Sequence, residues 1–337
     1  DRYSEDMYAT WWAGGAVVPM NTHWSAAENA YSLNDSGAEI LFVDINFLPM
    51  MEAMREEVKG LKTVVYVDDG DLPDGMLAFE DLIAGNDPCD DAVRSDDQLA
   101  GLFYTGGTTG MPKGATLTHF NVVNNGYFVG QAMKFSEADR LCIPVPLYHC
   151  FGMVMGVLTC TTHGAAMIFP GEGFEAGDVL AAVAAERCTA LHGVPTMFIG
   201  ELDHADFANS DLSTLRTGIM AGAPCPVEVM KRVQKEMNMG EVTIAYGMTE
   251  TSPVSLQSST DDPLEKRVST VGRVMPHVQV KVIDDEGRVV TRGARGEWCT
   301  RGYSVLRGEW HDDDKSAAPI DSAGWMTTGD MAEIEVE

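Results

Sequence analysis

The stretch Phe103-Tyr104-Thr105-Gly106-Gly107-Thr108-Thr109-Gly110-Met111-Pro112-Lys113-Gly114 places four glycines, three threonines and one lysine within twelve residues. Glycine adopts positive φ and lets a ligand approach the backbone closely, so successive N–H groups here can turn toward one anion. Apolar residues 99–104 predict a buried strand before the stretch, and Thr118 can cap a helix predicted over residues 119–133. A phosphate-binding loop between a strand and a helix favours an α/β fold. The alternative is a flexible surface loop without a ligand, because the stretch lacks the Gly-Lys-Ser/Thr of a P-loop.

The rest of the chain supports this fold class, because strand-like and helix-like segments alternate along most of it. Ser25 and Glu28 form a capping-box pattern that opens a helix. From about residue 269 the pattern changes to short alternating strands separated by turns, which predicts an antiparallel, β-rich part. We predict strands at residues 16–20, 39–43, 63–67, 99–104, 141–145, 165–169, 189–194, 214–220, 242–246, 278–283, 289–290 and 296–300, and helices at residues 25–33, 47–58, 78–83, 119–133, 151–162, 175–187 and 226–238.

Composition narrows the class of protein. The 51 acidic and 23 basic residues give a net charge of −28, which argues against nucleic acid as a partner. A protein with this charge that binds nucleotide phosphates must concentrate its positive charge or bind Mg²⁺. Seven cysteines without a CxxC pair indicate reduced thiols and predict a cytoplasmic protein. The longest apolar run, residues 151–160, is too short to cross a membrane.

Three further stretches follow the glycine-rich one in a fixed order: Pro-Leu-Tyr-His-Cys-Phe-Gly at 146–152, Ala-Tyr-Gly-Met-Thr-Glu-Thr at 245–251 and Gly-Trp-Met-Thr-Thr-Gly-Asp at 324–330. Together the four stretches resemble the motifs of the adenylate-forming superfamily, which includes acyl-CoA synthetases, luciferases and the adenylation domains of peptide synthetases. The resemblance covers essentially the whole chain. It implies two flavodoxin-like parallel-sheet subdomains, at 1–136 and 137–268, and a smaller antiparallel subdomain, a distorted barrel, at 269–337. It also leads us to expect that the chain lacks its N-terminal start and a C-terminal lid domain that carries the catalytic lysine.

The activity that the resemblance implies is ATP-dependent activation of a carboxylic acid to an acyl-adenylate with release of pyrophosphate, followed by transfer to coenzyme A. Thr109, Lys113, His149, Thr249 and Glu250 would be catalytic, and Thr109 and Glu250 would hold Mg²⁺. The nucleotide would contact Thr105, Gly106, Gly107, Thr108, Thr109, Gly110, Lys113, Gly222, Ala223, Pro224, Tyr246, Gly247, Met248, Thr249 and Asp330. Taken alone, Tyr246 is as well explained by core packing, and Glu250 by a helix dipole.

The acid substrate is less determined by the sequence. The resemblance places His149 beside the substrate carboxylate, although a histidine at a strand end is also a common structural residue. No carboxylate lies between residues 144 and 156 to pair an ammonium group, which argues against an amino acid as the substrate. The residues that would line an apolar acyl pocket are His149, Phe151, Gly152, Met155, Val194 and Met220, for which a plain core helix is the alternative at most positions.

A medium- or long-chain fatty acid is the leading substrate, and Gly106, where many members of the superfamily have serine, favours the fatty acyl branch. An aryl-acid CoA ligase and a non-catalytic nucleotide-binding member are the alternatives. A peripheral membrane contact that supplies the substrate and a homodimer are both compatible with this interpretation.

Overall fold

The computed structural model describes residues 2–106, 111–311 and 320–335. The chain forms two compact units, which are described separately: residues 1–119 with 307–313, and residues 120–306 with 314–337. The division into three subdomains stays a prediction.

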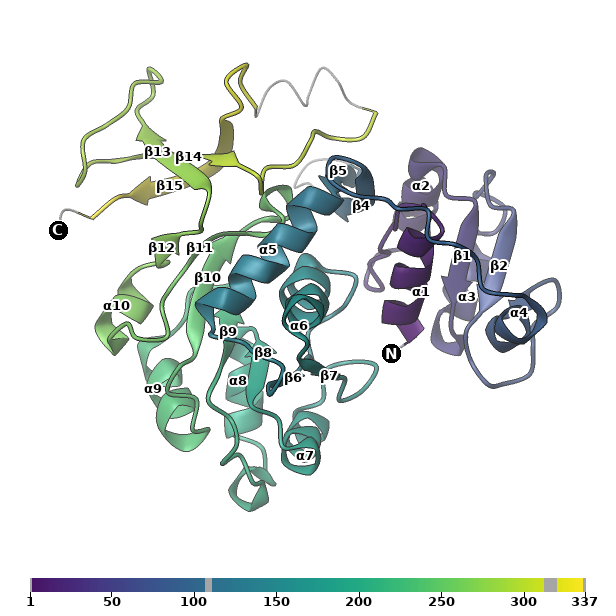
Figure 1. The fold of residues 1–337 in the computed structure, drawn as a ribbon, viewed down its shortest axis with the longest axis horizontal. Coiled ribbons are helices and arrows are strands. Elements are labelled where there is room, and N and C mark those ends of the chain that lie inside the picture. The colour runs from purple at the N-terminus through teal and green to yellow at the C-terminus, as the bar shows by residue number, and fades with distance from the viewer. Residues whose placement is uncertain (1, 107–110, 312–319, 336–337) are drawn as a thin grey trace. The chain divides into compact units, whose positions relative to one another are not determined.

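The first unit begins with helices and a small parallel sheet of strand order β1-β2-β3 (Figure 1). Helix α2 starts at the predicted capping box, where Glu28 N donates to Ser25 Oγ and Ser25 N donates to the Glu28 carboxylate. It ends at Gly37, whose φ of 68° lies in the left-handed region that glycine adopts at the lowest cost. The elements are α1 (Arg2–Trp12), α2 (Ala26–Ser36), β1 (Ile40–Val43), the 3₁₀ turn η1 (Ile45–Phe47), α3 (Leu48–Met54), β2 (Thr63–Tyr66), β3 (Leu77–Ala78) and α4 (Phe79–Gly85).

The glycine-rich stretch joins the two strands of an antiparallel hairpin, β4 (Leu99–Thr105) and β5 (Lys113–Thr118). Strand β4 is as predicted, whereas β5 was missed. The strand expected at residues 16–20 is reduced to one parallel bridge between Val17 and Gly101. Residues 307–310 run beside β5, since Thr116 N donates to Gly308 O and Trp310 N donates to Gly114 O. The base of the loop is therefore held from both sides by backbone hydrogen bonds.

The second unit is built on a seven-stranded sheet of order β12-β11-β10-β9-β8-β6-β7. The strands from β10 to β7 are parallel, and β11 and β12 are added antiparallel. Its strands are β6 (Arg140–Cys142), β7 (Ala166–Ile168), β8 (Ala190–Gly193), β9 (Thr217–Ala221), β10 (Thr243–Gly247), β11 (Val254–Gln257) and β12 (Arg273–Val274). Its helices and turns are α5 (His119–Ala132), η2 (Phe151–Leu158), α6 (Thr159–His163), α7 (Ala176–Glu186), α8 (Pro195–Leu202), η3 (Phe207–Asn209), α9 (Val227–Glu236), η4 (Thr249–Thr251) and α10 (Leu264–Ser269).

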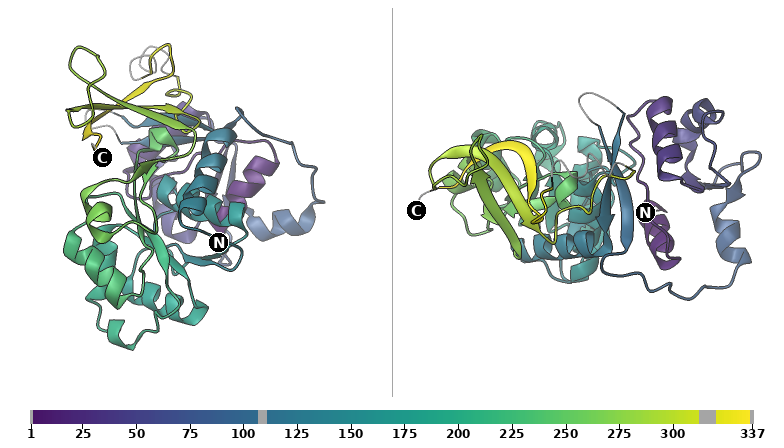
Figure 2. Two further views of the ribbon diagram at one scale, coloured as in Figure 1. Left: turned by 60° about the vertical axis from the view of Figure 1, so that its left-hand side comes forward. Right: turned by 90° about the horizontal axis from the view of Figure 1, so that it is seen from above.

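Helices cover both faces of this sheet (Figures 1 and 2). Because side chains alternate along a strand, Met220 joins the core beneath α7, α8 and α9, while its neighbour Ile219 joins the core beneath α5, η2 and α6. Both strand neighbours are fully buried. The parallel strands are thus apolar on both faces, as their nearly continuous hydrophobic sequence predicts.

The helix expected at residues 151–162 is wrong in detail, because its first part is a π-helix, η2, that continues into the short α6. All eight residues of η2 are buried. A Cβ on Gly152 would lie 2.3 Å from the carbonyl oxygen of Pro146, so glycine is needed for this close approach. Hydrophobic periodicity cannot distinguish π from α turns in a segment that is buried all round.

The C-terminal part of the second unit is an antiparallel sheet of β13 (Val278–Ile283), β14 (Arg295–Gly302) and β15 (Met326–Glu333), whose strong twist is visible in Figure 2. The strand expected at 289–290 is only a bridge between Val289 and Ile283. Within the described residues, the structure contains no helix with the length and apolar character needed to cross a membrane.

Candidate functional site

Several predicted site residues of the second unit follow the carboxyl ends of four neighbouring strands. Because β6, β8, β9 and β10 are parallel, these ends meet at one edge of the sheet. His149 follows β6, Val194 follows β8, Gly222 follows β9, and Tyr246 lies near the end of β10. Ligands of open α/β sheets bind at this edge. The topology therefore collects motifs that lie far apart in the sequence.

The 146–152 and 245–251 stretches make direct contact within this unit. A side-chain hydrogen bond links Thr249 to the Cys150 thiol, and the charge of Glu250 also acts on that thiol. Burial, with a smaller contribution from Glu250, raises the pKa of Cys150 to about 12, so the thiol is neutral and unreactive at pH 7. Glu250 itself is partly exposed. A hydroxyl and a carboxylate are thus placed side by side at the edge, with the carboxylate accessible to a ligand.

Tyr246 and Asp330 form a second contact at this site. The Tyr246 hydroxyl donates a 2.5 Å hydrogen bond to Asp330 Oδ2, which connects the end of β10 to β15. Burial, followed by this hydrogen bond, raises the pKa of Tyr246. Gly329, with φ of 78°, precedes the exposed Asp330. One carboxylate oxygen of Asp330 therefore orients the ring of Tyr246, and these two predicted nucleotide contacts are neighbours.

Glycines shape the backbone after β9 and β10. Gly222 has φ of 86°, and a Cβ there would lie 3.2 Å from Val194. Gly222, Ala223 and Pro224 are all exposed, so their backbone is open to a ligand. A Cβ on Gly247 would lie 1.8 Å from the carbonyl oxygen of Pro253. The same oxygen accepts a hydrogen bond from Met248 N.

His149 lies at the start of η2, where its Nδ1 accepts a 3.1 Å hydrogen bond from Phe151 N. In the neutral ring this leaves the proton on Nε2, which can donate to a carboxylate. His149 is an exposed residue, yet the protein packed around its ring lowers the pKa by desolvation. His149 therefore has the tautomer, the access and the neutral state that a hydrogen-bond donor to a substrate acid requires.

The predicted acyl-contacting residues do not all lie together. Phe151 and Met155 are buried in the core beneath α5, and Val194 packs against the same core. Gly152 lies between Phe151 and Met155 in η2. Met220 points to the other core and contacts the thiol of Cys225, so the structure separates it from the rest. The set that the structure assembles is His149 with Phe151, Gly152, Met155 and Val194.

In the first unit, the described part of the glycine-rich loop presents one lysine, Lys113. Lys113 is opposite Thr105 in the β4–β5 register, and its ammonium donates to both carboxylate oxygens of Glu309 at 3.0 Å. Gly106 is exposed. The predicted phosphate contacts Gly107, Thr108, Thr109 and Gly110 lie outside the described residues. The contact between Lys113 and Glu309 was not predicted from the sequence. Glu309 lies far along the chain from Lys113 and belongs to none of the four motifs.

A second network, also missed from the sequence, supports the base of this hairpin. Tyr104 Oη donates a 2.6 Å hydrogen bond to Asp35 Oδ2, and Trp310 Nε1 donates to Asp35 O at 3.0 Å. A Cβ on Gly114 would lie within 3.2 Å of both Tyr104 and Trp310. Burial, with the Asp35 hydrogen bond next, raises the pKa of Tyr104. The end of α2 therefore fixes strand β4 and the 307–310 segment, which lie on either side of Lys113.

The donor types of the second unit fit Mg²⁺. Of the two residues predicted to hold Mg²⁺, Glu250 offers carboxylate oxygens, which this hard cation prefers, and Thr109 lies outside the described residues. Among the described residues, no group of three His, Cys, Asp or Glu side chains is arranged to hold a metal ion.

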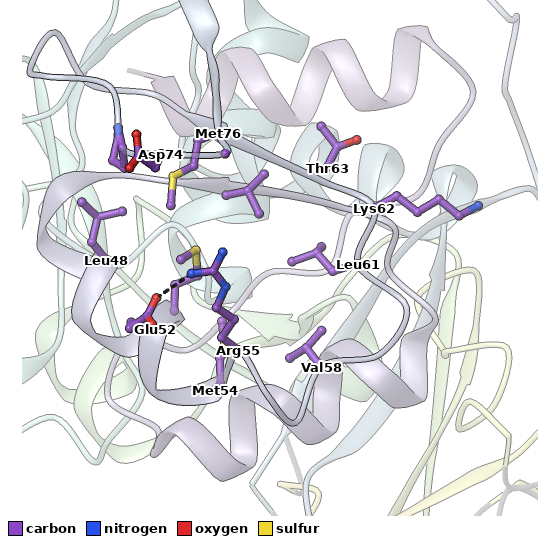
Figure 3. Close-up of a pocket in the computed structure, with 14 residues that line it drawn as sticks. Leu48, Glu52, Met54, Arg55, Val58, Leu61, Lys62, Thr63, Asp74 and Met76 are labelled. Atoms are coloured by element: carbon purple, nitrogen blue, oxygen red, sulfur yellow. Dashed lines mark hydrogen bonds and ion pairs between the residues drawn. The ribbon is translucent and has the colours of Figure 1, made fainter.

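A cavity of about 440 Å³ in the first unit contains none of the predicted site residues. It lies between α3 and the strand that follows it, and Figure 3 shows Arg55 reaching across to Glu52, with Met54 and Met76 nearby. Of its charged lining residues, Arg55 pairs with Glu52, and Lys62 pairs with Glu39, which lies outside the lining. We assign it no role in the site.

Comparisons with known proteins bear on the whole arrangement. The model of the family "AMP-binding enzyme" matches residues 3–310. YngI of Bacillus subtilis (strain 168), provisionally named an acyl-CoA synthetase, is 44% identical over 97% of this chain and 64% of its own length. The mitochondrial medium-chain acyl-CoA ligase ACSF2 of Danio rerio is 35% identical over 97% of this chain and 58% of its own length.

The crystal structure of the anthranilate CoA ligase AuaEII in complex with anthranoyl-AMP superposes with a TM-score of 0.92 and 25% sequence identity. The match covers 99% of this chain and 64% of that one. The chain thus spans less than two thirds of the length of each of these three proteins. The order of the four motifs and the extent of these matches place the chain in the AMP-binding enzyme family.

Proposed function

We propose that the protein activates a carboxylic acid with ATP, forms an acyl-adenylate and transfers the acyl group to coenzyme A. The observation that carries the proposal is the grouping of Thr249, Glu250 and His149 at the carboxyl edge of the sheet, beside the Tyr246–Asp330 pair. Relatives and solved structures named as CoA ligases support the same reaction.

In the proposed reaction, an oxygen of the substrate carboxylate attacks the α-phosphorus of ATP. The bond from that phosphorus to the bridging oxygen breaks, and pyrophosphate leaves with the electron pair. The thiol of coenzyme A then attacks the acyl carbonyl, loses its proton, and AMP leaves. The first half-reaction, which forms the acyl-adenylate, depends on charge stabilisation more than on proton transfer.

The residues of this chain take simple roles in that scheme. Lys113 offers positive charge to the terminal phosphates, and Thr249 offers a hydroxyl to the α-phosphate. Asp330 accepts from ribose hydroxyls, for which its two oxygens are suited, and the Tyr246 ring packs against the base. Nε2 of His149 donates to the substrate carboxylate. Glu250 would hold Mg²⁺, which supplies charge neutralisation at the phosphates when bound.

For the acid, we propose a medium- or long-chain fatty acid. The buried, uncharged set of Phe151, Gly152 and Met155 with Val194 supports an apolar chain, and the name of the ACSF2 relative supports the medium-chain class. An aryl acid is the second candidate, favoured by the likeness to the anthranilate CoA ligase.

The test is acid-dependent ATP–pyrophosphate exchange by the full-length protein, with fatty acids of graded length, benzoates and α-amino acids. Each added methylene is expected to contribute up to about 0.8 kcal/mol until the pocket is full, so the rate should climb with length and then stop. A preference for benzoates would favour the second candidate. Exchange with free α-amino acids, or the same rate for every chain length, would contradict the apolar pocket.

A further inference from the structure

The π-helix η2 carries three of the proposed acyl contacts. A buried histidine side chain on the sheet contacts this helix. His192 lies on β8 and is fully buried. Its Nε2 is 3.0 Å from the carbonyl oxygen of Met155, and its Nδ1 accepts a 3.2 Å hydrogen bond from Ile219 N on β9. The ring also packs against Phe151, with 5.6 Å between ring centroids.

One neutral tautomer satisfies both partners of His192. With the proton on Nε2, the ring donates to Met155 O and accepts from Ile219 N. A protonated ring would place an N–H of its own against the N–H of Ile219, which is unfavourable in a buried site. Burial lowers the pKa of His192 to about 4, in agreement with this assignment. The imidazole therefore acts as a fixed connector between the sheet and η2.

The hydrogen bond from His192 to Met155 O lies where it can control the orientation of the side chains proposed to contact the acyl group. A π turn advances each side chain by a smaller angle than an α turn, so a change between the two turns would rotate Met155 away from its present direction. His149 and Thr159 also bind η2, through Phe151 N at 3.1 Å and Val154 O at 3.4 Å. Only the His192 contact reaches the Met155 carbonyl from a neighbouring strand among the described hydrogen bonds.

We propose that His192 is a positioning residue that fixes the π register of η2 and thereby sets which acyl chains the protein accepts. The part of this inference that concerns acyl chains rests on the proposed function. The part that concerns the register of η2 does not, so the two can be tested separately.

Three substitutions in the full-length protein separate the two hydrogen bonds. In His192→Gln, the side-chain amide can reach Met155 O as Nε2 does. In His192→Asn, the shorter side chain can accept from Ile219 N but falls short of Met155 O. His192→Phe keeps an aromatic ring and loses both bonds. The control is Thr217→Val on β9, which removes a buried 2.9 Å hydrogen bond to Glu241 O and involves no residue of η2.

The first measurement is amide hydrogen exchange over residues 151–158. Exchange should be at least about tenfold faster in the Asn and Phe variants, because η2 loses its connection to the sheet, and within about threefold of wild type in the Gln and Thr217→Val proteins. Two results would overturn the proposed positioning role. One is protection over residues 151–158 that is equal in all four variants, and the other is a loss of protection in His192→Gln and Thr217→Val as large as in the Asn and Phe variants.

The second measurement is kcat/KM for acids of graded length in pyrophosphate exchange. The ratio between the preferred acid and an acid two carbons longer should change by about tenfold in the Asn and Phe variants and remain close to wild type in Gln. An unchanged ratio in active Asn and Phe variants would overturn the link to specificity. If wild type activates none of the acids, the proposed function fails, while hydrogen exchange still decides the role of His192. If Asn and Phe do not fold, the Gln variant decides, because a shifted ratio there would contradict the proposal.

Discussion

At the scale of single residues, the proposed function depends on a few charged side chains whose contacts the structure describes. The Lys113 ammonium contacts both oxygens of Glu309, and the Glu309 carboxylate is only 16% exposed. The same carboxylate that orients Lys113 also opposes the approach of a phosphate, because like charges repel strongly at such distances. Glu309 therefore restrains Lys113 at the base of the glycine-rich loop.

Glu309→Gln tests this restraint. We expect KM for ATP to fall by roughly threefold to tenfold with little change in kcat, because the amide no longer competes with phosphate oxygens for Lys113 and Coulomb repulsion is removed. Steady-state kinetics of the full-length protein measure this. Glu236→Gln, which breaks a surface ion pair with Arg232, is the matched control. A higher KM in Glu309→Gln would show that the pair positions Lys113 and does not restrain it.

His192 predicts a pH dependence of stability. The pKa of this residue is about 4 in the folded protein and 6.5 when unperturbed, so the unfolded state binds a proton at a higher pH than the folded state. Stability is therefore present above pH 6.5 and is lost as the pH falls from 6.5 toward 4, by up to roughly 3 kcal/mol. Denaturant unfolding across this range should show a smaller loss in His192→Gln than in wild type. An identical slope in both proteins would contradict the neutral, buried imidazole.

At the scale of elements, the sequence predicted most segments that place the site. The capping box of α2, strand β4 and the parallel strands β8, β9 and β10 were all predicted from local signals. Strand β5 was missed because Lys113, Gly114 and Ala115 have low strand propensity, and its partner β4 supplies the pairing that local propensity does not.

Two other elements show where such reasoning stops. Helix α1 was missed although Tyr3, Met7 and Trp11 recur at the spacing of one helix face, a signal that was available. The π-turns of η2 could not be predicted, because they depend on contacts with His192 and the sheet, which are remote in sequence. Of the candidate site, the motif residues were predicted from the sequence and stay predictions, whereas the contacts of Asp35, Glu309 and His192 needed the structure.

Gly152→Ala tests the packing of η2. The added Cβ would lie 2.3 Å from a backbone oxygen, which cannot move without displacing the chain before η2, so we expect a loss of several kcal/mol in stability. Thermal unfolding measures it. Gly173→Ala is the matched control, because a Cβ there meets nothing within 4 Å, and its stability should stay within about 0.5 kcal/mol of wild type. Equal melting temperatures for both variants would contradict the described packing.

At the scale of the whole molecule, a chain of net charge −28 is proposed to bind a polyphosphate anion. Positive charge must then be local, and the proposed function assigns this role to Lys113 and a Mg²⁺ ligand role to Glu250. Each of the two residues is proposed to supply charge stabilisation during adenylation. Substitution of Lys113 removes a positive charge and substitution of Glu250 removes a negative charge, so the two proposed roles can be tested separately.

The most direct test is ATP–pyrophosphate exchange by the full-length wild-type protein and by Glu250→Gln and Lys113→Ala. Both variants should lose at least about a hundredfold in rate, because each lacks charge stabilisation at the reacting phosphates, and both should remain folded. Lys231→Ala, which breaks a pair with Glu228 at similar exposure, and Glu265→Gln should keep wild-type rates. Near-normal exchange in Glu250→Gln and Lys113→Ala would contradict the account.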